Sequence, residues 1–393
     1  MKPVYLLALC RTPIGSFGGS LKDMKAAELG SVVIREAIRR AGLNPEIVDE
    51  VIMGNVLQAG QGQNPARQAA VLAGIPWGVP SSTINKVCGS GLYSIALARQ
   101  AILAGEAECI VAGGMESMSS CPFALDKQRW GNKLGDVTAR DILVYDGLWD
   151  VFNQYHMGIT AENIAMQFGI TRQMQDEFSV ESQRKAGIAS QNGRFSAEIV
   201  AIDIPQPKSQ SVLFDKDEYI KAGTTIEKIT RLAPVFKKDG TVTAANSSGI
   251  NDGAAAVVVA SQKFVMRHNL KPMAEIIATG SVGVDPALMG LGPIPAIKKA
   301  LARTELSIDD LDLIEINEAF AAQSIAVIKE INLNPVKVNV NGGAIALGHP
   351  IGASGARILV TLIYEMQQRS CLYGAATLCI GGGMGEAMIV KSC

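Results

Sequence analysis

The sequence has almost no excess of charge of either sign. Its 36 Lys and Arg residues balance 37 Asp and Glu residues, so the formal net charge is −1 over 393 residues. The Lys and Arg residues are scattered, so the chain lacks the basic footprint of a nucleic-acid-binding protein. Charged residues make up only 19% and hydrophobic residues 48% of the chain. That balance is typical of a well-buried globular enzyme and argues against disorder.

The cysteines lack the pairing and spacing of disulfides or zinc sites. Their number is seven, which is odd, and none form a C-x-x-C motif. The short apolar run at residues 4–10 predicts a first buried strand and not an export signal. We therefore expect free thiols, no metal site and a cytoplasmic protein. No apolar stretch approaches the roughly 18 residues of a membrane span, so we expect no membrane partner.

What is present is an alternation of strand and helix patterns. Residues 3–9 predict a strand, and residues 26–42 predict a helix with apolar positions every three to four residues, ending at its C-terminal glycine. Strand, helix and strand patterns follow at residues 49–56, 90–105 and 107–116. Such alternation predicts an α/β fold with a mostly parallel sheet covered on both faces.

The second half of the chain repeats landmarks of the first. Three pairs of segments match in order, at offsets of 263, 264 and 269: 49–55 with 312–318, 89–91 with 353–355, and 110–115 with 379–384. Matches at nearly one offset indicate an internal repeat. We infer two similar α/β halves facing each other across a pseudo-twofold axis.

The repeat also predicts the domain organisation. The first half is residues 1–119, completed by about 250–270, and the second half is residues 271–393. Residues 120–249 have no counterpart and predict an inserted, loop-rich domain that contains a polar helix at 171–191. Ligands of such sheets bind near the carboxyl ends of the strands, so we expect the site where the two halves meet.

Cys88 lies where a strand turns into a helix, in NKVCGSG at residues 85–91. A free cysteine is most often a small buried apolar residue. At a helix N-terminus, however, the helix dipole and free N–H groups favour the thiolate. The position therefore predicts a lowered thiol pKa and a nucleophile, and the flanking glycines let backbone amides face a ligand oxygen.

Three other positions combine polar groups with strand ends or glycine loops. His349, one of three histidines, is either a surface loop residue or a base near Cys88. The second interpretation is possible because the repeat places His349 three residues before the position equivalent to Cys88. Cys379 is either a core cysteine or an acid/base at the end of an apolar strand. The glycines after it do not keep dinucleotide-binding spacing. Asn317 is either a turn residue or holds a water or an oxyanion.

These segments resemble the motifs of the thiolase family, in their order and spacing. The four most specific are NKVCGSG at 85–91, NEAFA at 317–321, GGAIALGHPIGASG at 342–355 and CIGGGMGEA at 379–387. RTPIGSFGG at 11–19, GNVLQAGQGQNPARQAA at 54–70 and NSSGINDGAAA at 246–256 agree with them. The resemblance covers essentially the whole chain. It is closest to the biosynthetic, acetoacetyl-CoA-forming members, because YHMGITAEN at 155–163 resembles their pocket loop.

The resemblance implies a thiolase fold and a reversible Claisen condensation of two acetyl-CoA to acetoacetyl-CoA and CoA. No cofactor is implied, because CoA is part of the substrate. By resemblance, Cys88 carries the acetyl group, His349 activates it, and Cys379 removes the α-proton of the second acetyl-CoA. Asn317 holds a water that helps to bind the second thioester oxygen. The backbone N–H groups of Cys88 and Gly381 hold the oxyanion.

The resemblance also implies a CoA site in the inserted domain. The residues it assigns to substrate binding are His156, Met157, Lys221, Ser248, Met289, Ala319 and Phe320. Met157 and Met289 line a small acyl pocket, and Ser248 contacts the pantetheine arm. Lys221 stands where relatives often carry Arg near the nucleotide end, and Lys228 where a smaller polar residue is common. Lysine is a point charge without the planar fork of arginine, so these contacts differ from the family pattern.

Alternatives remain open at this stage. A degradative 3-ketoacyl-CoA thiolase of broader chain length is disfavoured by His156, but pocket width cannot be read from the sequence. Ketoacyl synthases of the same fold lack a second cysteine like Cys379. A non-catalytic acyl-CoA-binding scaffold is disfavoured because all four catalytic-type residues are present. The family implies a homodimer or a homotetramer built as a dimer of dimers, with part of 120–143 pairing the dimers.

Overall fold

The computed structural model describes residues 2–206 and 209–393. Its strands are β1 (Val4–Arg11), β2 (Gly15–Ser16), β3 (Glu50–Gly54), β4 (Ser81–Ile84), β5 (Cys109–Ser117), β6 (Phe123–Leu125), β7 (Ala139–Asp141), β8 (Trp149–Asp150), β9 (Tyr155–His156), β10 (Ile202–Gln206), β11 (Ser209–Phe214), β12 (Asn251–Ser261), β13 (Ala274–Gly283), β14 (Leu313–Ile316), β15 (Tyr373–Ile380) and β16 (Met384–Ser392).

The helices are α1 (Ala26–Arg40), α2 (Pro65–Leu72), α3 (Ser90–Ala104), α4 (Met157–Gln167), α5 (Arg172–Gln191), α6 (Ile226–Ile229), α7 (Gln262–Arg267), α8 (Pro293–Leu301), α9 (Ala321–Glu330), α10 (Ala344–Leu347) and α11 (Ser354–Arg369). Short 3₁₀ or π segments are η1 (Pro45–Ile47), η2 (Gln128–Trp130), η3 (Leu143–Leu148), η4 (Pro286–Leu291) and η5 (Pro335–Lys337).

The main sheet has the same strand sequence on both sides of its centre. The order is β14-β15-β16-β13-β1-β12-β5-β3-β4, with β2 beside β12. At the centre, β13 and β1 are joined by only two residue pairs, Tyr5 with Glu275 and Leu6 with Ala274. Outward from there, β1, β12, β5 and β3 correspond to β13, β16, β15 and β14. The two similar halves are confirmed, but the prediction of a mostly parallel sheet is wrong, because only β3–β4, β3–β5 and β14–β15 pair in parallel.

One of the three repeat matches is also wrong. The topology sets β5 opposite β15, the strand that follows α11 as β5 follows α3, so the offset there stays near 264 and not 269. The shared glycines misled the alignment because they serve different purposes. Gly113 and Gly114 lie inside β5, where a Cβ would strike neighbouring backbone, whereas Gly382 and Gly383 turn the chain from β15 into β16 with φ of 82° and 84°.

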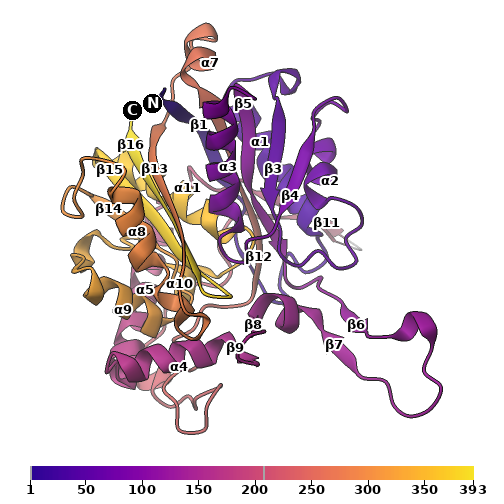
Figure 1. The fold of residues 1–393 in the computed structure, drawn as a ribbon, viewed down its shortest axis with the longest axis vertical. Coiled ribbons are helices and arrows are strands. Elements are labelled where there is room, and N and C mark those ends of the chain that lie inside the picture. The colour runs from indigo at the N-terminus through magenta and orange to yellow at the C-terminus, as the bar shows by residue number, and fades with distance from the viewer. Residues whose placement is uncertain (1, 207–208) are drawn as a thin grey trace.

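Three layers of helix enclose the two halves of the sheet. The apolar faces of α1 and α2 cover the outer face of the first half, and α8 covers the outer face of the second (Figure 1). Between the halves, α3 packs against α11 in the central core. These two helices begin at Ser90 and Ser354, as the offset of 264 predicts.

The central position of α3 bears on the membrane expectation. By length and composition residues 87–104 could cross a membrane, contrary to the expectation that no stretch is long enough. Half of that window is buried inside the structure, where α3 contacts α11 and β5. Apolar composition here follows from a helix that is covered on several sides by the protein core.

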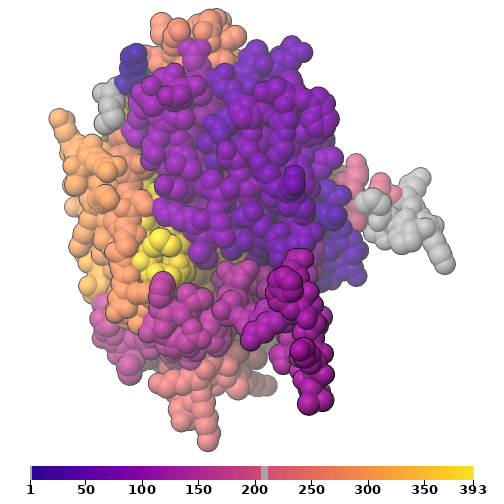
Figure 2. Space-filling view, turned by 45° about the vertical axis from the view of Figure 1, so that its right-hand side comes forward, coloured from indigo at the N-terminus to yellow at the C-terminus, as the bar shows by residue number. Residues whose placement is uncertain are grey.

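The region between β5 and β12 holds more regular structure than predicted. The polar helix predicted at 171–191 is confirmed as α5, capped by the Thr171 hydroxyl, which accepts from the Met174 N–H. α4 packs on α9 and η4, and α5 packs on α9 and α10, so both contact the second half. The β6–β7 hairpin projects from the body of the molecule (Figures 1 and 2). The proposed domain limits at 120 and 249 stay a prediction.

Candidate active site

Cys88 sits on a strained turn between β4 and α3. The residue before it, Val87, has φ of 46°, which is rare for a β-branched residue and persists only where surrounding contacts hold it. The hydroxyl of Ser90, the first residue of α3, donates to the Val87 carbonyl over 2.7 Å and accepts from the Lys86 N–H over 2.8 Å. The half-buried thiol is thereby presented at the end of the helix.

A buried ion pair ties the same turn to the second half of the chain. The Lys86 ammonium lies 2.6 Å from the carboxylate of Glu386 on β16 and 3.8 Å from the centroid of the Tyr93 ring. In the opposite direction, Glu116 of β5 accepts from the Gly352 N–H, in the loop after His349, over 2.9 Å. Each half therefore contributes a buried carboxylate that holds a loop of the other half, and each loop carries a predicted site residue.

His349 lies in the loop between α10 and α11 and is only 5% exposed. Its Nδ1 is 2.6 Å from the Ser354 hydroxyl, and the backbone N–H of His349 donates to the Asn251 side-chain oxygen over 2.9 Å. The fully buried amide nitrogen of Asn317 is 3.4 Å from Nε2. Among the described residues, no group hydrogen-bonds the buried Asn317 Oδ1. Asn317 thus combines a contact to the histidine with unused hydrogen-bonding capacity.

The turn after β15 brings two more predicted residues to Cys88. Cys379, near the end of β15, is buried and packs among Met157, Ala319 and other apolar residues. Two residues on, the backbone N–H of Gly381 acts with the N–H of Cys88 itself to lower the pKa of the Cys88 thiol, against the larger effect of burial. A Cβ on Gly381 would lie 3.3 Å from Val87, so this close approach favours glycine. The two predicted oxyanion donors therefore both lie close enough to the Cys88 thiol to affect its pKa.

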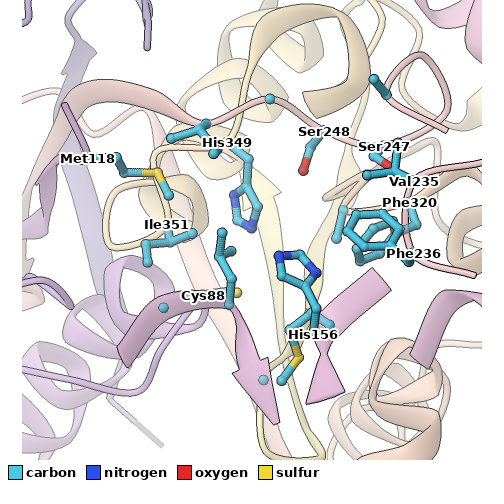
Figure 3. A pocket seen from close by; sticks show the side chains of 18 of the residues that line it. Cys88, Met118, His156, Val235, Phe236, Ser247, Ser248, Phe320, His349 and Ile351 are labelled. Atoms are coloured by element: carbon cyan, nitrogen blue, oxygen red, sulfur yellow. The ribbon is translucent and has the colours of Figure 1, made fainter. Parts of the chain in front are cut away.

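These groups surround a cavity of about 330 Å³ with mostly apolar walls (Figure 3). The predicted residues that line it are Cys88, His156, Met157, Ser248, Met289, Ala319, Phe320, His349 and Gly381. Figure 3 shows the His349 ring pointing toward Cys88 from the opposite wall. Three predicted residues, Asn317, Cys379 and Lys221, do not line the cavity. Asn317 contacts His349, which does line it, and Cys379 packs against residues of the cavity wall.

The predicted lowering of the Cys88 pKa is wrong. Burial raises the pKa of the thiol to about 11, and the N–H groups of Gly381 and Cys88 offset this only in part. Burial, with a smaller effect of the Arg357 charge, lowers the pKa of His349 to about 3. Burial and then the neighbouring Cys88 raise the pKa of Cys379 well above its usual range. At neutral pH the site therefore rests as two thiols and one neutral imidazole.

Several cavity residues were not predicted. Phe236 stacks on the His156 ring at 4.6 Å between centroids and makes an edge contact with Phe320 at 6.3 Å. Met118 and Ile351 line the wall on the other side of Cys88 (Figure 3). Phe236 stands in an irregular segment without periodicity, so only the family resemblance could have indicated it.

Lys221 lies at the rim and not in the cavity. Its exposed ammonium is 4.8 Å from the centroid of the Tyr219 ring, and Tyr219 lines the cavity. Its backbone N–H donates to the Gln183 side chain over 2.8 Å. Lys228 is also exposed and donates to the Gly223 carbonyl over 2.7 Å. Lys221 is therefore near the entrance, where an anionic part of a ligand would remain in contact with water.

Two α/β halves that bring a cysteine and a histidine to one cavity at their junction are the arrangement of a class of acyl-transferring condensing enzymes. Comparison with known proteins identifies the family. The description "Thiolase, N-terminal domain" matches residues 4–263, and "Thiolase, C-terminal domain" matches residues 270–392. The chain therefore belongs to the thiolase family, and it is an acyl-transferring enzyme with the thiolase fold.

Relatives of known name cover the full length of the chain. It is 57% identical over 391 residues to an acetyl-CoA acetyltransferase of Cupriavidus necator, covering 100% of both chains. It is 55% identical to a probable acetyl-CoA acyltransferase of Staphylococcus aureus, covering 100% of this chain and 99% of the relative.

Solved structures give the same result for the fold. The acetyl-CoA acetyltransferase of Bacillus anthracis superposes with a TM-score of 0.98 at 46% identity, and human mitochondrial 3-ketoacyl-CoA thiolase with 0.97 at 44%, each covering 100% of this chain and 99% of the other. A structure of the human enzyme in complex with CoA has a TM-score of 0.96 at 44% identity, covering 100% of this chain and 98% of the other.

Proposed function

We propose that the enzyme joins two acetyl-CoA molecules into acetoacetyl-CoA and CoA, reversibly, through an acetyl group carried on Cys88. The observation that carries the proposal is that Cys88, His349 and Gly381 line one cavity, where the backbone N–H groups of Cys88 and Gly381 both favour negative charge at the thiol. Donors placed where an oxyanion develops typically contribute 10²–10³-fold each in rate. Metabolite levels set the direction.

The protonation states support a balanced two-step cycle. In the first step His349 takes the Cys88 proton as the sulfur attacks the thioester carbonyl, and Cys379 gives its proton to the departing CoA thiolate. In the second step the Cys379 thiolate takes an α-proton from the second acetyl-CoA, and the carbanion attacks acetyl-Cys88. The Cys88 thiolate then leaves and recovers its proton from His349. Each group returns to its resting form, so no cofactor beyond the CoA of the substrate is required.

His349 and Asn317 are suited to the second thioester oxygen. Their side chains lie side by side, and the protonated imidazole would donate to the enolate oxygen while the spare capacity of Asn317 would hold a bridging water. Ser248, Ala319 and Phe320 would contact the pantetheine arm of CoA. Such donors stabilise charge that exists only during the reaction, which is what raises turnover.

The crowding of the acyl end supports acetyl groups over longer chains. His156 stacks on Phe236, and Met157 and Met289 line the same cavity, so the space beside Cys88 is bounded by large side chains. A degradative 3-ketoacyl-CoA thiolase is the alternative, because a human relative of that name has the same fold at 44% identity.

Thiolysis of acetoacetyl-CoA and of 3-ketooctanoyl-CoA separates these functions. We expect kcat/KM to favour acetoacetyl-CoA by 10²-fold or more, and Met289→Ala to narrow that preference by admitting the longer chain. Equal kcat/KM values for the two substrates in the unmodified enzyme would replace the proposal with the degradative function.

We also propose a cytoplasmic homotetramer built as a dimer of dimers. The edge strand β4 pairs only with β3 among the described residues, and its free side is available to the same strand of a second copy. The β6–β7 hairpin carries exposed Phe123, Trp130 and Leu134, which a second dimer would cover. A dimer without further pairing is the alternative.

A further inference from the structure

The imidazole of His349 has one close hydrogen-bond partner among the described side chains. Its Nδ1 is 2.6 Å from the Ser354 hydroxyl, whereas the Asn317 amide nitrogen is 3.4 Å from Nε2 and 3.5 Å from Nδ1. Ser354 is fully buried at the first position of α11, and its hydroxyl also lies 2.9 Å from the Pro350 carbonyl. The contact between Ser354 and His349 is therefore short and shielded from water.

The second contact of the hydroxyl decides which ring nitrogen carries the proton. A carbonyl oxygen can only accept, so Ser354 must donate its one hydrogen to Pro350. Its oxygen then accepts from Nδ1–H of His349, which leaves Nε2 without a proton. A neutral imidazole acts as a base only through its unprotonated nitrogen.

We propose that Ser354 is a positioning residue that fixes His349 in the Nδ1–H tautomer and leaves Nε2 free to take the Cys88 proton. The inference rests on the proposed function, in which His349 is that base. Ser354 does not line the substrate cavity, so we expect it to act through His349.

The first half of the chain contains a counterpart of this arrangement. Ser90, at the matching position of α3, donates to the carbonyl of Val87 and so holds the turn of the nucleophile. Ser354 does the same for the loop of the base and has in addition a ring nitrogen to orient. The repeat thus supplies a reason why both helices begin with a buried serine.

Of the groups around His349, Ser354 makes the shortest contact to one ring nitrogen, whereas the Asn317 amide nitrogen lies 3.4 Å from Nε2 and 3.5 Å from Nδ1 and so does not select between them. From α11 the Arg357 charge disfavours a protonated ring, and from the turn before α3 and the end of β15 come the uncharged thiols of Cys88 and Cys379. Asn251 at the start of β12 is uncharged and engages only the backbone of His349. Glu116 of β5 holds the nearby Gly352 N–H.

The test is the rate of Cys88 alkylation by iodoacetamide, read by peptide mass spectrometry across pH 6 to 11. A general base typically contributes 10²–10⁴-fold, so we expect His349→Ala to slow alkylation at pH 7 by at least 10²-fold. Ser354→Ala should slow it about tenfold, and Ser354→Thr, which keeps the hydroxyl, should restore most of the rate. The double variant should be no slower than His349→Ala.

Ser94→Ala is the matched control. Ser94 is an equally buried helix serine whose hydroxyl donates to the carbonyls of Gly91 and Gly113 and is not hydrogen-bonded to a histidine. It should lower the melting temperature about as much as Ser354→Ala and leave alkylation within twofold. The deficit of Ser354→Ala should vanish as pH approaches 11, because hydroxide then ionises the thiol without a base.

Two results separate failure of this inference from failure of the proposed function. If His349→Ala slows alkylation while Ser354→Ala matches Ser94→Ala at every pH, the positioning role of Ser354 is wrong and the base stands. If His349→Ala leaves alkylation unchanged, the proposed base fails and this inference fails with it. A deficit in Ser354→Ala that persists at pH 11, or that adds to His349→Ala, would assign Ser354 a structural role only.

Discussion

Cys88 and Cys379 are two thiols that burial keeps protonated, next to a histidine that burial keeps neutral. A helix N-terminus ordinarily favours a thiolate by at most a few kcal/mol. Here the apolar wall of the cavity outweighs that effect. In the proposed cycle the nucleophile is created when the proton moves to His349 during attack, and the resting enzyme is protected from unwanted oxidation or alkylation of a standing thiolate.

The resting protonation state can be measured by thiolate absorbance at 240 nm. Because the pKa of Cys88 is raised to about 11, the difference between the unmodified enzyme and Cys88→Ser should be flat through pH 7 and rise only as pH approaches 11. The thiol is neutral below its pKa and ionised above it, so an absorbance difference already present at pH 7 would show a standing thiolate and contradict this account.

Lys221 gives a second prediction at this scale. Its ammonium is exposed at the cavity entrance, away from Cys88, so Lys221→Ala should raise KM for CoA substrates several-fold and leave kcat within twofold. Lys228→Ala, which removes a neighbouring exposed cation, serves as the comparison. A large fall in kcat at unchanged KM would contradict the assignment of Lys221 to CoA binding.

Individual residues were predictable where a motif marks them and not where packing alone places them. Cys88, Gly381 and His349 stand in long glycine-rich motifs, and the structure brings them to one cavity. Phe236 has no such mark, and its stacking on His156 depends on the path of an irregular segment. The direction of the Cys88 pKa shift was predicted wrongly because the burial that raises this pKa comes from residues that are distant in the sequence. The turn that precedes α3 does not reveal it.

Among the elements, the paired N-termini of α3 and α11 set the distance between Cys88 and His349. Gly91 and Gly355 allow this contact. A Cβ on Gly91 would lie 2.8 Å from the Ala356 nitrogen, and one on Gly355 would collide with the backbone of Leu92. Cys88 and His349 precede these helices, so any separation of the helix ends moves the two reacting groups apart.

Gly91→Ala and Gly355→Ala should therefore each destabilise the fold by about 1–3 kcal/mol, the usual cost of overpacking, and slow acetylation of Cys88. Gly78→Ala, where a Cβ meets nothing within 4 Å, should leave both properties unchanged. Thermal unfolding and the rate of acetyl-enzyme formation are the two measurements. Wild-type values for both core variants would show that the helix ends do not control the site.

Elements with strong periodicity were predicted well. The helix expected at 26–42 is α1, with Gly42 at φ of 66° just beyond its end, and the strand expected at 107–116 is β5. Short elements such as β8 and β9 were missed because two residues carry no periodicity. The share of parallel strand pairs was overestimated because β12 pairs antiparallel with β5, and β16 pairs antiparallel with β15. No sequence pattern indicated the direction of these two strands.

For the whole molecule, the β6–β7 hairpin is the surface that we expect to contact another subunit. Trp130 is 86% and Leu134 94% exposed on this projecting arm (Figure 2). Exposed apolar side chains of this size cost free energy in water and favour burial between subunits. The repeat and the fold concern one chain, so the assembly was predictable only through the family resemblance.

The combined variant Trp130→Asp, Leu134→Asp should lower the solution mass from that of a tetramer to that of a dimer, measured by light scattering. Lys133→Asp, a charge change on the same arm, should leave the mass unchanged. Activity per subunit should persist in both, since the arm lies outside the cavity. If the solution mass is the same for the unmodified protein and both variants, the arm does not pair the dimers.

The central claim is that Cys88 carries the acetyl group, and intact-protein and peptide mass spectrometry after mixing with acetyl-CoA tests it most directly. We predict one acetyl group, on the peptide that contains Cys88, absent from Cys88→Ala and discharged by added CoA. Acetylation of another cysteine, or none in active protein, would contradict the account.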